Sequence, residues 1–130
     1  MKYRILVVED NPLNLELLCA WLETEGYEVL SAADLKSAFA SLQNMKPHAV
    51  LLDIQLGDDD GLSLAAWIRE QPDLCHIPVI AVTAHALVGE REQILQSGCT
   101  AFIPKPVNFN LLQEHLDRWL TRSEMPPSAD

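Results

Sequence analysis

Basic residues are scarce in this 130-residue sequence, which has only nine lysines and arginines against nineteen aspartates and glutamates. The formal net charge at pH 7 is therefore -10. A chain of this charge lacks the basic face that broad binding to nucleic acid or to anionic lipid requires. The composition thus argues against direct contact with nucleic acid and against a membrane surface as the partner.

Cysteines and long apolar runs are also few. The three cysteines cannot form a closed set of disulfides, and no two of them have the CxxC spacing. No apolar run approaches the length of a membrane span, and the N-terminus has too short an apolar stretch for a signal peptide. We therefore expect a cytoplasmic protein with reduced thiols, and the length predicts one domain.

Short apolar runs alternate with helical patterns along the chain. Residues 3–8, 49–52 and 79–82 have the composition of strands buried on both faces of a parallel sheet, and two weaker runs suit edge strands at 28–32 and 101–103. The helical patterns cover residues 12–26, 34–42, 61–70, 88–96 and 108–120. A strand followed by a helix, five times over, predicts an α/β fold with helices on both faces of a parallel sheet.

Polar side chains stand where the predicted strands end. They are three carboxylates, a hydroxyl and an ammonium: Glu9, Asp10, Asp53, Thr83 and Lys105. Right-handed crossovers bring the carboxyl ends of all strands to one edge of the sheet, so we expect these groups to converge. Mutually repulsive acids require either a cation among them or protonation of some of them, and oxygen ligands without histidine or cysteine favour Mg²⁺ as that cation. With the metal, the ammonium and the hydroxyl could hold a phosphoryl group on a carboxylate oxygen.

Four motifs carry a resemblance to a known family. They are VVEDN at 7–11, LLDIQL at 51–56 followed by Gly61, VIAVTA at 79–84 and FIPKP at 102–106. With these motifs, in this order and spacing, the chain resembles the receiver domain of bacterial two-component response regulators over residues 2–121. The resemblance implies a flavodoxin-like (βα)5 three-layer sandwich with parallel strand order 2-1-3-4-5. We expect the domain to span residues 1–121, followed by a disordered tail at 122–130.

The resemblance also implies a reaction and a metal. Asp53 would accept a phosphoryl group from the phosphohistidine of a histidine kinase or phosphotransfer protein. Asp10 and Asp53 would bind Mg²⁺ directly, Glu9 would act largely through water, and the backbone carbonyl of Gln55 would complete the protein's share of ligands. The domain would carry intrinsic autophosphorylation and autodephosphorylation chemistry, as a signalling protein and not as an enzyme.

Further positions receive roles from the same resemblance. Thr83 would bond a phosphoryl oxygen and Lys105 would form a salt bridge to the phosphoryl group. Thr83 and Phe102 would act as switch residues on activation. Gln55 and His85 would flank the path of the attacking water and tune the rate of hydrolysis.

The sequence departs from the family pattern after the phosphoacceptor. Gly57 stands where proline is usual and Asp59 where an apolar residue is usual, which predicts altered partner contact or loop mobility. Phe102 replaces the common tyrosine and cannot donate a hydrogen bond. The Lys105–Pro106 peptide bond is expected to be cis by resemblance alone.

The way this domain would pass on its signal depends on the chain that follows these motifs. Ten residues follow residue 120, too few for an output module, so we expect signalling through a downstream protein or a receiver excised from a longer hybrid protein. The last helix, which carries Trp119, is a candidate surface for a weak homodimer or a partner.

Two other functions compete with the signalling interpretation. A metal-dependent phosphohydrolase of the haloacid dehalogenase type would need an aspartate where Gln55 stands. A nucleotide or flavin binder would need a turn rich in glycine, serine or threonine where Glu9 and Asp10 stand.

Overall fold

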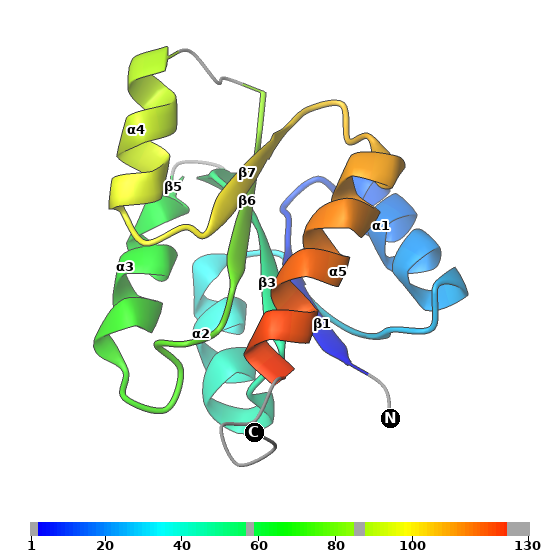
Figure 1. Ribbon diagram of the computed structural model, residues 1–130, viewed down its shortest axis with the longest axis horizontal. Coiled ribbons are helices and arrows are strands. Elements are labelled where there is room, and N and C mark those ends of the chain that lie inside the picture. Colours follow the sequence, from blue (N-terminus) through cyan, green and yellow to red (C-terminus); the bar gives the residue numbers. More distant parts are fainter. Residues whose placement is uncertain (1–2, 57–58, 85–87, 125–130) are drawn as a thin grey trace.

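A five-stranded parallel sheet forms the centre of the computed structural model, which describes residues 3–56, 59–84 and 88–124 (Figure 1). The strands are β1 (Arg4–Val8), β2 (Glu28–Ala32), β3 (Ala49–Asp53), β6 (Val79–Thr83) and β7 (Ala101–Pro104). Their order across the sheet is β2-β1-β3-β6-β7. Counting only the strands of this sheet, this is the predicted order 2-1-3-4-5, with the two weaker runs at its edges as expected.

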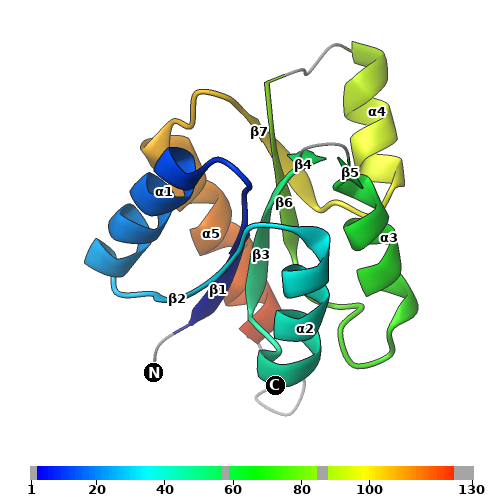
Figure 2. The same ribbon diagram turned by 180° about the vertical axis from the view of Figure 1, so that it is seen from behind.

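Five helices cover the two faces of the sheet. The helices α1 (Pro12–Thr24) and α5 (Phe109–Glu124) lie on one face, and α2 (Leu35–Met45), α3 (Leu62–Glu70) and α4 (Val88–Gln96) lie on the other (Figures 1 and 2). Each face has its own apolar core, to which both the sheet and the helices of that face contribute. The predicted three-layer α/β sandwich is therefore confirmed.

The strand β1 carries buried apolar side chains on both faces of the sheet. In β1, Ile5 and Val7 pack toward α1 and α5, whereas Leu6 and Val8 join the core beneath α2, α3 and α4. All four side chains are at most 1% exposed. A continuous apolar run is the pattern that such a strand requires, because successive side chains alternate between two buried faces.

Two helices begin at residues whose side chains cap them. The Asn11 side chain accepts hydrogen bonds from the backbone N–H groups of Leu13 and Asn14, at 3.0 and 3.1 Å. Asp34 Oδ1 accepts a bond of 2.7 Å from the N–H of Ser37. Both side chains satisfy N–H groups that have no partner within the helix, and thereby fix where α1 and α2 begin.

Three features differ from the sequence prediction. Helix α2 continues to Met45 and ends at Lys46, which has φ 44° without being glycine, so no residue type signals this end. Helix α5 continues to Glu124, beyond the expected domain end at 121, and residues 125–130 of the expected tail lie outside the described residues. An antiparallel pair of two-residue strands, β4 (Gln55–Leu56) and β5 (Asp59–Asp60), was not predicted.

A half-buried arginine joins the end of α3 to two other segments of the chain. The Arg69 guanidinium donates hydrogen bonds of 2.7 to 3.1 Å, whose acceptors are the carbonyl oxygens of Gly98, Cys75 and Ile77 and the Thr100 hydroxyl. These acceptors lie before β6 and before β7, so this one side chain holds α3 against the amino ends of two sheet strands.

The described helices include none with the length and apolar character of a membrane span.

Candidate functional site

The candidate site lies at the carboxyl ends of four neighbouring strands. Glu9 and Asp10 follow β1, Asp53 ends β3, Thr83 ends β6 and Lys105 follows β7. The register of the sheet aligns these ends, and the Lys105 N–H donates a 2.8 Å hydrogen bond to the Thr83 carbonyl oxygen. The structure therefore places all five predicted residues at one edge of the sheet.

Three carboxylates form a cluster at this edge. One oxygen each from Glu9, Asp10 and Asp53 lies within 4.8 Å of the others. Glu9 and Asp53 are only 2% and 5% exposed, whereas Asp10 is exposed. A set of hard oxygen donors with one side open to solvent fits Mg²⁺, which prefers a few carboxylates and retains several waters. The residues present thus suit the metal that the sequence predicts.

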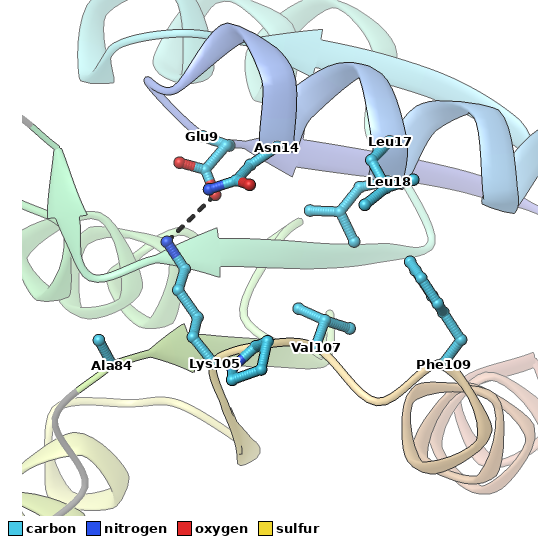
Figure 3. Close-up of a pocket in the computed structure, with 9 residues that line it drawn as sticks. Glu9, Asn14, Leu17, Leu18, Ala84, Lys105, Val107 and Phe109 are labelled. Atoms are coloured by element: carbon cyan, nitrogen blue, oxygen red, sulfur yellow. Dashed lines mark ion pairs between the residues drawn. The ribbon is translucent and has the colours of Figure 1, made fainter.

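Lys105 bridges the two buried carboxylates. Its Nζ lies 3.3 Å from Glu9 Oε1 and 3.2 Å from Asp53 Oδ2, and Figure 3 shows the side chain reaching across toward α1. Burial lowers the pKa of Lys105, but the Asp53 and Glu9 carboxylates outweigh this effect and raise it above its ordinary value. The ammonium therefore stays charged and neutralises part of the cluster.

Glu9 has an unusual protonation equilibrium. Burial, together with a hydrogen bond to Asp53, raises the pKa of Glu9 to about 7. The N–H of Asn11 donates a 3.2 Å bond to Glu9 Oε2 and opposes the rise. Glu9 therefore takes up a proton near neutral pH, because burial disfavours its charged form and the neighbouring Asp53 adds to this effect.

Backbone contacts hold the Asp53 side chain and its strand. The N–H of Gln55 donates a 3.2 Å bond to Asp53 Oδ1, and the N–H of Gly61 donates a 2.7 Å bond to the Ile54 carbonyl. A Cβ at Gly61 would lie 2.5 Å from the Asp53 carbonyl oxygen, so only glycine allows α3 to start this close to Asp53. The sequence marked Gly61 as part of a motif but gave no sign of this contact.

The predicted switch and rate-tuning residues occupy different places. Thr83 is 4% exposed at the edge with the carboxylates, whereas Phe102 is half-buried on β7 and packs toward the core under α4. The Arg91 guanidinium of α4 lies 5.5 Å from the Phe102 ring centre, a contact that sequence reasoning missed. His85 lies outside the described residues.

Two further expectations concern loops beside the site. The Lys105–Pro106 peptide bond is cis, as expected. Gly57 lies outside the described residues, and the described strand β5 begins directly after that gap at Asp59. The expected effect of Gly57 and Asp59 on partner contact or loop mobility stays a prediction.

An apolar cavity of about 470 Å³ adjoins the carboxylates (Figure 3). Glu9 and Lys105 line one part of it, and Leu17 of α1 and Val107 line another. The Phe109 ring, also part of the lining, stacks on Trp21 of α1 with ring centres 5.0 Å apart. No sequence pattern pointed to this cavity, because its walls come from three separate segments.

Comparison with known proteins identifies the family. The sequence matches the response regulator receiver domain over residues 5–117, and the chain belongs to this family. It is therefore a receiver domain, the phosphoacceptor module of two-component signalling.

Relatives and solved structures agree with this assignment. The chain is 38% identical over 120 residues to the polar-differentiation response regulator DivK of Brucella anthropi, covering 92% of this chain and 98% of that protein. The receiver domain of sensor histidine kinase PA1611 from Pseudomonas aeruginosa, crystallised with a magnesium ion in its active-site cleft, is 39% identical with a TM-score of 0.85, covering 93% of this chain and 99% of that one. A histidine kinase receiver domain from Syntrophus aciditrophicus is 32% identical with a TM-score of 0.87, covering 97% and 96%.

Proposed function

We propose that Asp53 accepts a phosphoryl group from a histidine kinase or phosphotransfer protein in the presence of Mg²⁺, and that the modified domain signals to a downstream protein. The observation that carries this proposal is the convergence of three carboxylates with a lysine that bridges two of them. Asp53 is the carboxylate nearest the centre of the sheet, in contact with Lys105 on one oxygen and with a backbone N–H on the other.

The acidic cluster supports Mg²⁺ as the cofactor. Asp10 and Asp53 would hold the ion directly, Glu9 would act largely through water, and the Gln55 carbonyl would add a backbone ligand. Bound there, the ion would neutralise charge on the phosphoryl oxygens. The magnesium found in the cleft of the PA1611 receiver domain supports the same choice of metal.

The protein's own groups would position the reaction. The Gln55 N–H orients one Asp53 oxygen, which leaves the carboxylate with a fixed direction of attack. Lys105, already paired with Asp53, would form a salt bridge to one phosphoryl oxygen, and the Thr83 hydroxyl would donate a hydrogen bond to another. Phosphoryl transfer needs little beyond such positioning and charge stabilisation, so these residues would supply most of the catalysis.

Later steps would involve residues farther from the cluster. Gln55 and His85 would tune hydrolysis of the aspartyl phosphate, and Thr83 and Phe102 would change position on activation. The Lys105 N–H bond to the Thr83 carbonyl supports such coupling, because it ties the ends of β6 and β7 together. The helix α5 surface near Trp119 is the candidate contact for a weak homodimer or a partner, and the cytoplasmic location stays a prediction.

Labelling of a single aspartate tests the proposal. Incubation with acetyl phosphate and Mg²⁺ should add about 80 Da to the protein, the mass of one phosphoryl group on a carboxylate. Asp53→Asn should abolish the addition, whereas Asp60→Asn, a nearby acid that caps α3 through the N–H of Leu62, should retain it. Full labelling of Asp53→Asn would refute the assignment.

A further inference from the structure

The short strands β4 and β5 lie between Asp53 and the start of α3 (Figure 2). Gln55 pairs with Asp60, and Leu56 pairs with Asp59. The Leu56 side chain is 4% exposed and belongs to the apolar core beneath α2, α3 and α4. The segment that follows Asp53 is thus held by a defined register and by a buried side chain.

The register decides which way the Gln55 backbone faces. Hydrogen-bonded and non-hydrogen-bonded residue pairs alternate along an antiparallel ladder. The N–H of Gly61 donates a 2.7 Å bond to the Ile54 carbonyl, which is the contact of a hydrogen-bonded pair. The next pair, Gln55 with Asp60, is then of the non-hydrogen-bonded type. The Gln55 N–H accordingly bonds to Asp53 Oδ1, and the Gln55 carbonyl faces the same way, because both groups of an extended residue point to one edge of its strand.

Asp60 ties this arrangement to α3 through two hydrogen bonds. Its Oδ1 accepts a 2.9 Å bond from the N–H of Leu62, and its carbonyl oxygen accepts a 2.8 Å bond from the Ser63 hydroxyl. The Leu62 side chain is buried in the same core as Leu56. Both strands of the pair are therefore anchored in one core, β4 directly and β5 through the start of α3.

We infer that Asp60 is a positioning residue for the metal, because its bonds to α3 fix β5, and β5 keeps the Gln55 carbonyl on the side of the Asp53 carboxylate. The inference rests on the proposed function, in which that carbonyl is a backbone ligand of Mg²⁺. The three clustered carboxylates are Glu9, Asp10 and Asp53, so Asp60 acts through the backbone and not as a ligand. Removal of a group that orients a metal ligand commonly costs about 10- to 100-fold in metal affinity.

The geometry that Mg²⁺ requires explains why such positioning matters. The ion binds in a nearly octahedral arrangement, so a carbonyl ligand contributes fully only when its backbone is already in place. Without the bonds from α3, the pair β4–β5 could open, and part of the binding free energy would be needed to order it again. The contact between Lys105 and Asp53 does not depend on this pair, so the loss should fall on the metal.

Two substitutions of Asp60 separate the effect of the hydrogen bond from that of the charge. Asp60→Asn and Asp60→Ala both remove a negative charge, but only asparagine keeps an oxygen that can accept the bond from the Leu62 N–H. Titration of isotope-labelled protein with MgCl₂ alone, followed by two-dimensional NMR, gives the dissociation constant and shows whether each variant is folded. Asp60→Ala should bind Mg²⁺ about tenfold more weakly than Asp60→Asn. Ser63→Ala keeps the charge and removes one bond, so it should bind about two- to threefold more weakly than the unmodified chain.

Asp34 supplies the matched control. Its Oδ1 caps α2 through a 2.7 Å bond from the N–H of Ser37, but α2 follows β2, an edge strand that carries none of the carboxylates. Asp34→Ala and Asp34→Asn should therefore bind Mg²⁺ equally well. Equal affinities of Asp60→Ala and Asp60→Asn, or an equal loss between the two Asp34 variants, would overturn the inference and leave the proposed function standing.

The remaining results also decide the matter. If Asp60→Ala does not fold, Ser63→Ala decides, and an affinity equal to that of the unmodified chain would overturn the inference. If the unmodified chain shows no response to Mg²⁺, the metal of the proposed function is refuted, and the positioning role of Asp60 with it.

Discussion

A methyl group added at Gly61 would collide with the backbone of Asp53 and Ile54. An ideal Cβ there lies 2.5 Å from the Asp53 carbonyl oxygen and 2.9 Å from that of Ile54. Both oxygens belong to backbone, which cannot rotate away as a side chain can. The Gly61 N–H also donates a 2.7 Å bond to the Ile54 carbonyl, so withdrawal of residue 61 would stretch this hydrogen bond. Gly61 has φ -60°, so an alanine would be strained by the collision and not by its own dihedral angles.

The free-energy cost of Gly61→Ala follows from these contacts. Overpacking costs about 1–3 kcal/mol, and a weakened backbone hydrogen bond costs about 1 kcal/mol. Replacing glycine by alanine returns about 0.4–1 kcal/mol by restricting the unfolded chain. The net loss of unfolding free energy should be about 2 kcal/mol. Gly89→Ala in α4 is the matched control, because its Cβ would meet no heavy atom within 4 Å and should stabilise the helix by up to about 1 kcal/mol.

Urea unfolding followed by circular dichroism measures this difference. With a slope of about 2 kcal/mol per molar urea, Gly61→Ala should lower the midpoint by about 1 M, and Gly89→Ala should raise it slightly. The proposed phosphorylation of Asp53 should also slow in Gly61→Ala, because the Asp53 carbonyl must move. A Gly61→Ala protein as stable as the unmodified chain would refute the reasoning, since the contact would then be relieved at no cost.

Three other perturbations test the charges and contacts around the site. Because the pKa of Glu9 is raised to about 7, a proton competes with the metal, and the apparent Mg²⁺ affinity should fall about tenfold from about pH 8 to about pH 6. In a fluorescence titration, Glu9→Gln should lose most of this pH dependence. A pH dependence that stays unchanged in Glu9→Gln would contradict the role given to Glu9. Arg69→Met leaves three carbonyls and a hydroxyl without their donor, so it should lower the free energy of unfolding, measured in urea, by about 2–4 kcal/mol. A loss below about 0.5 kcal/mol would show that these hydrogen bonds contribute little to stability. Lys105→Met removes the ammonium between two buried carboxylates, so thermal unfolding should show a larger rise of Tm on adding Mg²⁺ than in the unmodified protein, and an equal rise would argue against that neutralising role.

The edge of the sheet was predictable because strand ends can be recognised in a sequence. Apolar runs that stop at Glu9, Asp53 and Thr83 fix the last buried position of each strand, and parallel pairing brings those ends together. The convergence of the acids then follows from topology alone. Mg²⁺ and a phosphoryl group held on a carboxylate were predicted from the chemistry of these side chains, whereas transfer from a histidine kinase was implied only by the resemblance to a known family.

Features that depend on backbone atoms could not be predicted in this way. The acceptors of Arg69 are mostly carbonyl oxygens, which every residue has, so no letter of the sequence marks them. The same holds for the contact between Gly61 and the Asp53 carbonyl. The cavity depends on the distance between α1 and the start of α5, where Trp21 stacks on Phe109. These features arise from packing, which periodicity predicts only in outline.

The charges at the site explain why phosphorylation can act as a signal. Glu9, Asp10 and Asp53 present three carboxyl groups to one ammonium, so the ionised cluster alone has fewer positive than negative charges. A divalent ion together with Lys105 would match three ionised carboxylates. Phosphorylation would then replace the single charge of Asp53 by a group of about -2, which restores an excess of negative charge. Because the nearby donors stand on the ends of β6 and β7, which share a hydrogen bond, we expect the excess to draw both strand ends inward together.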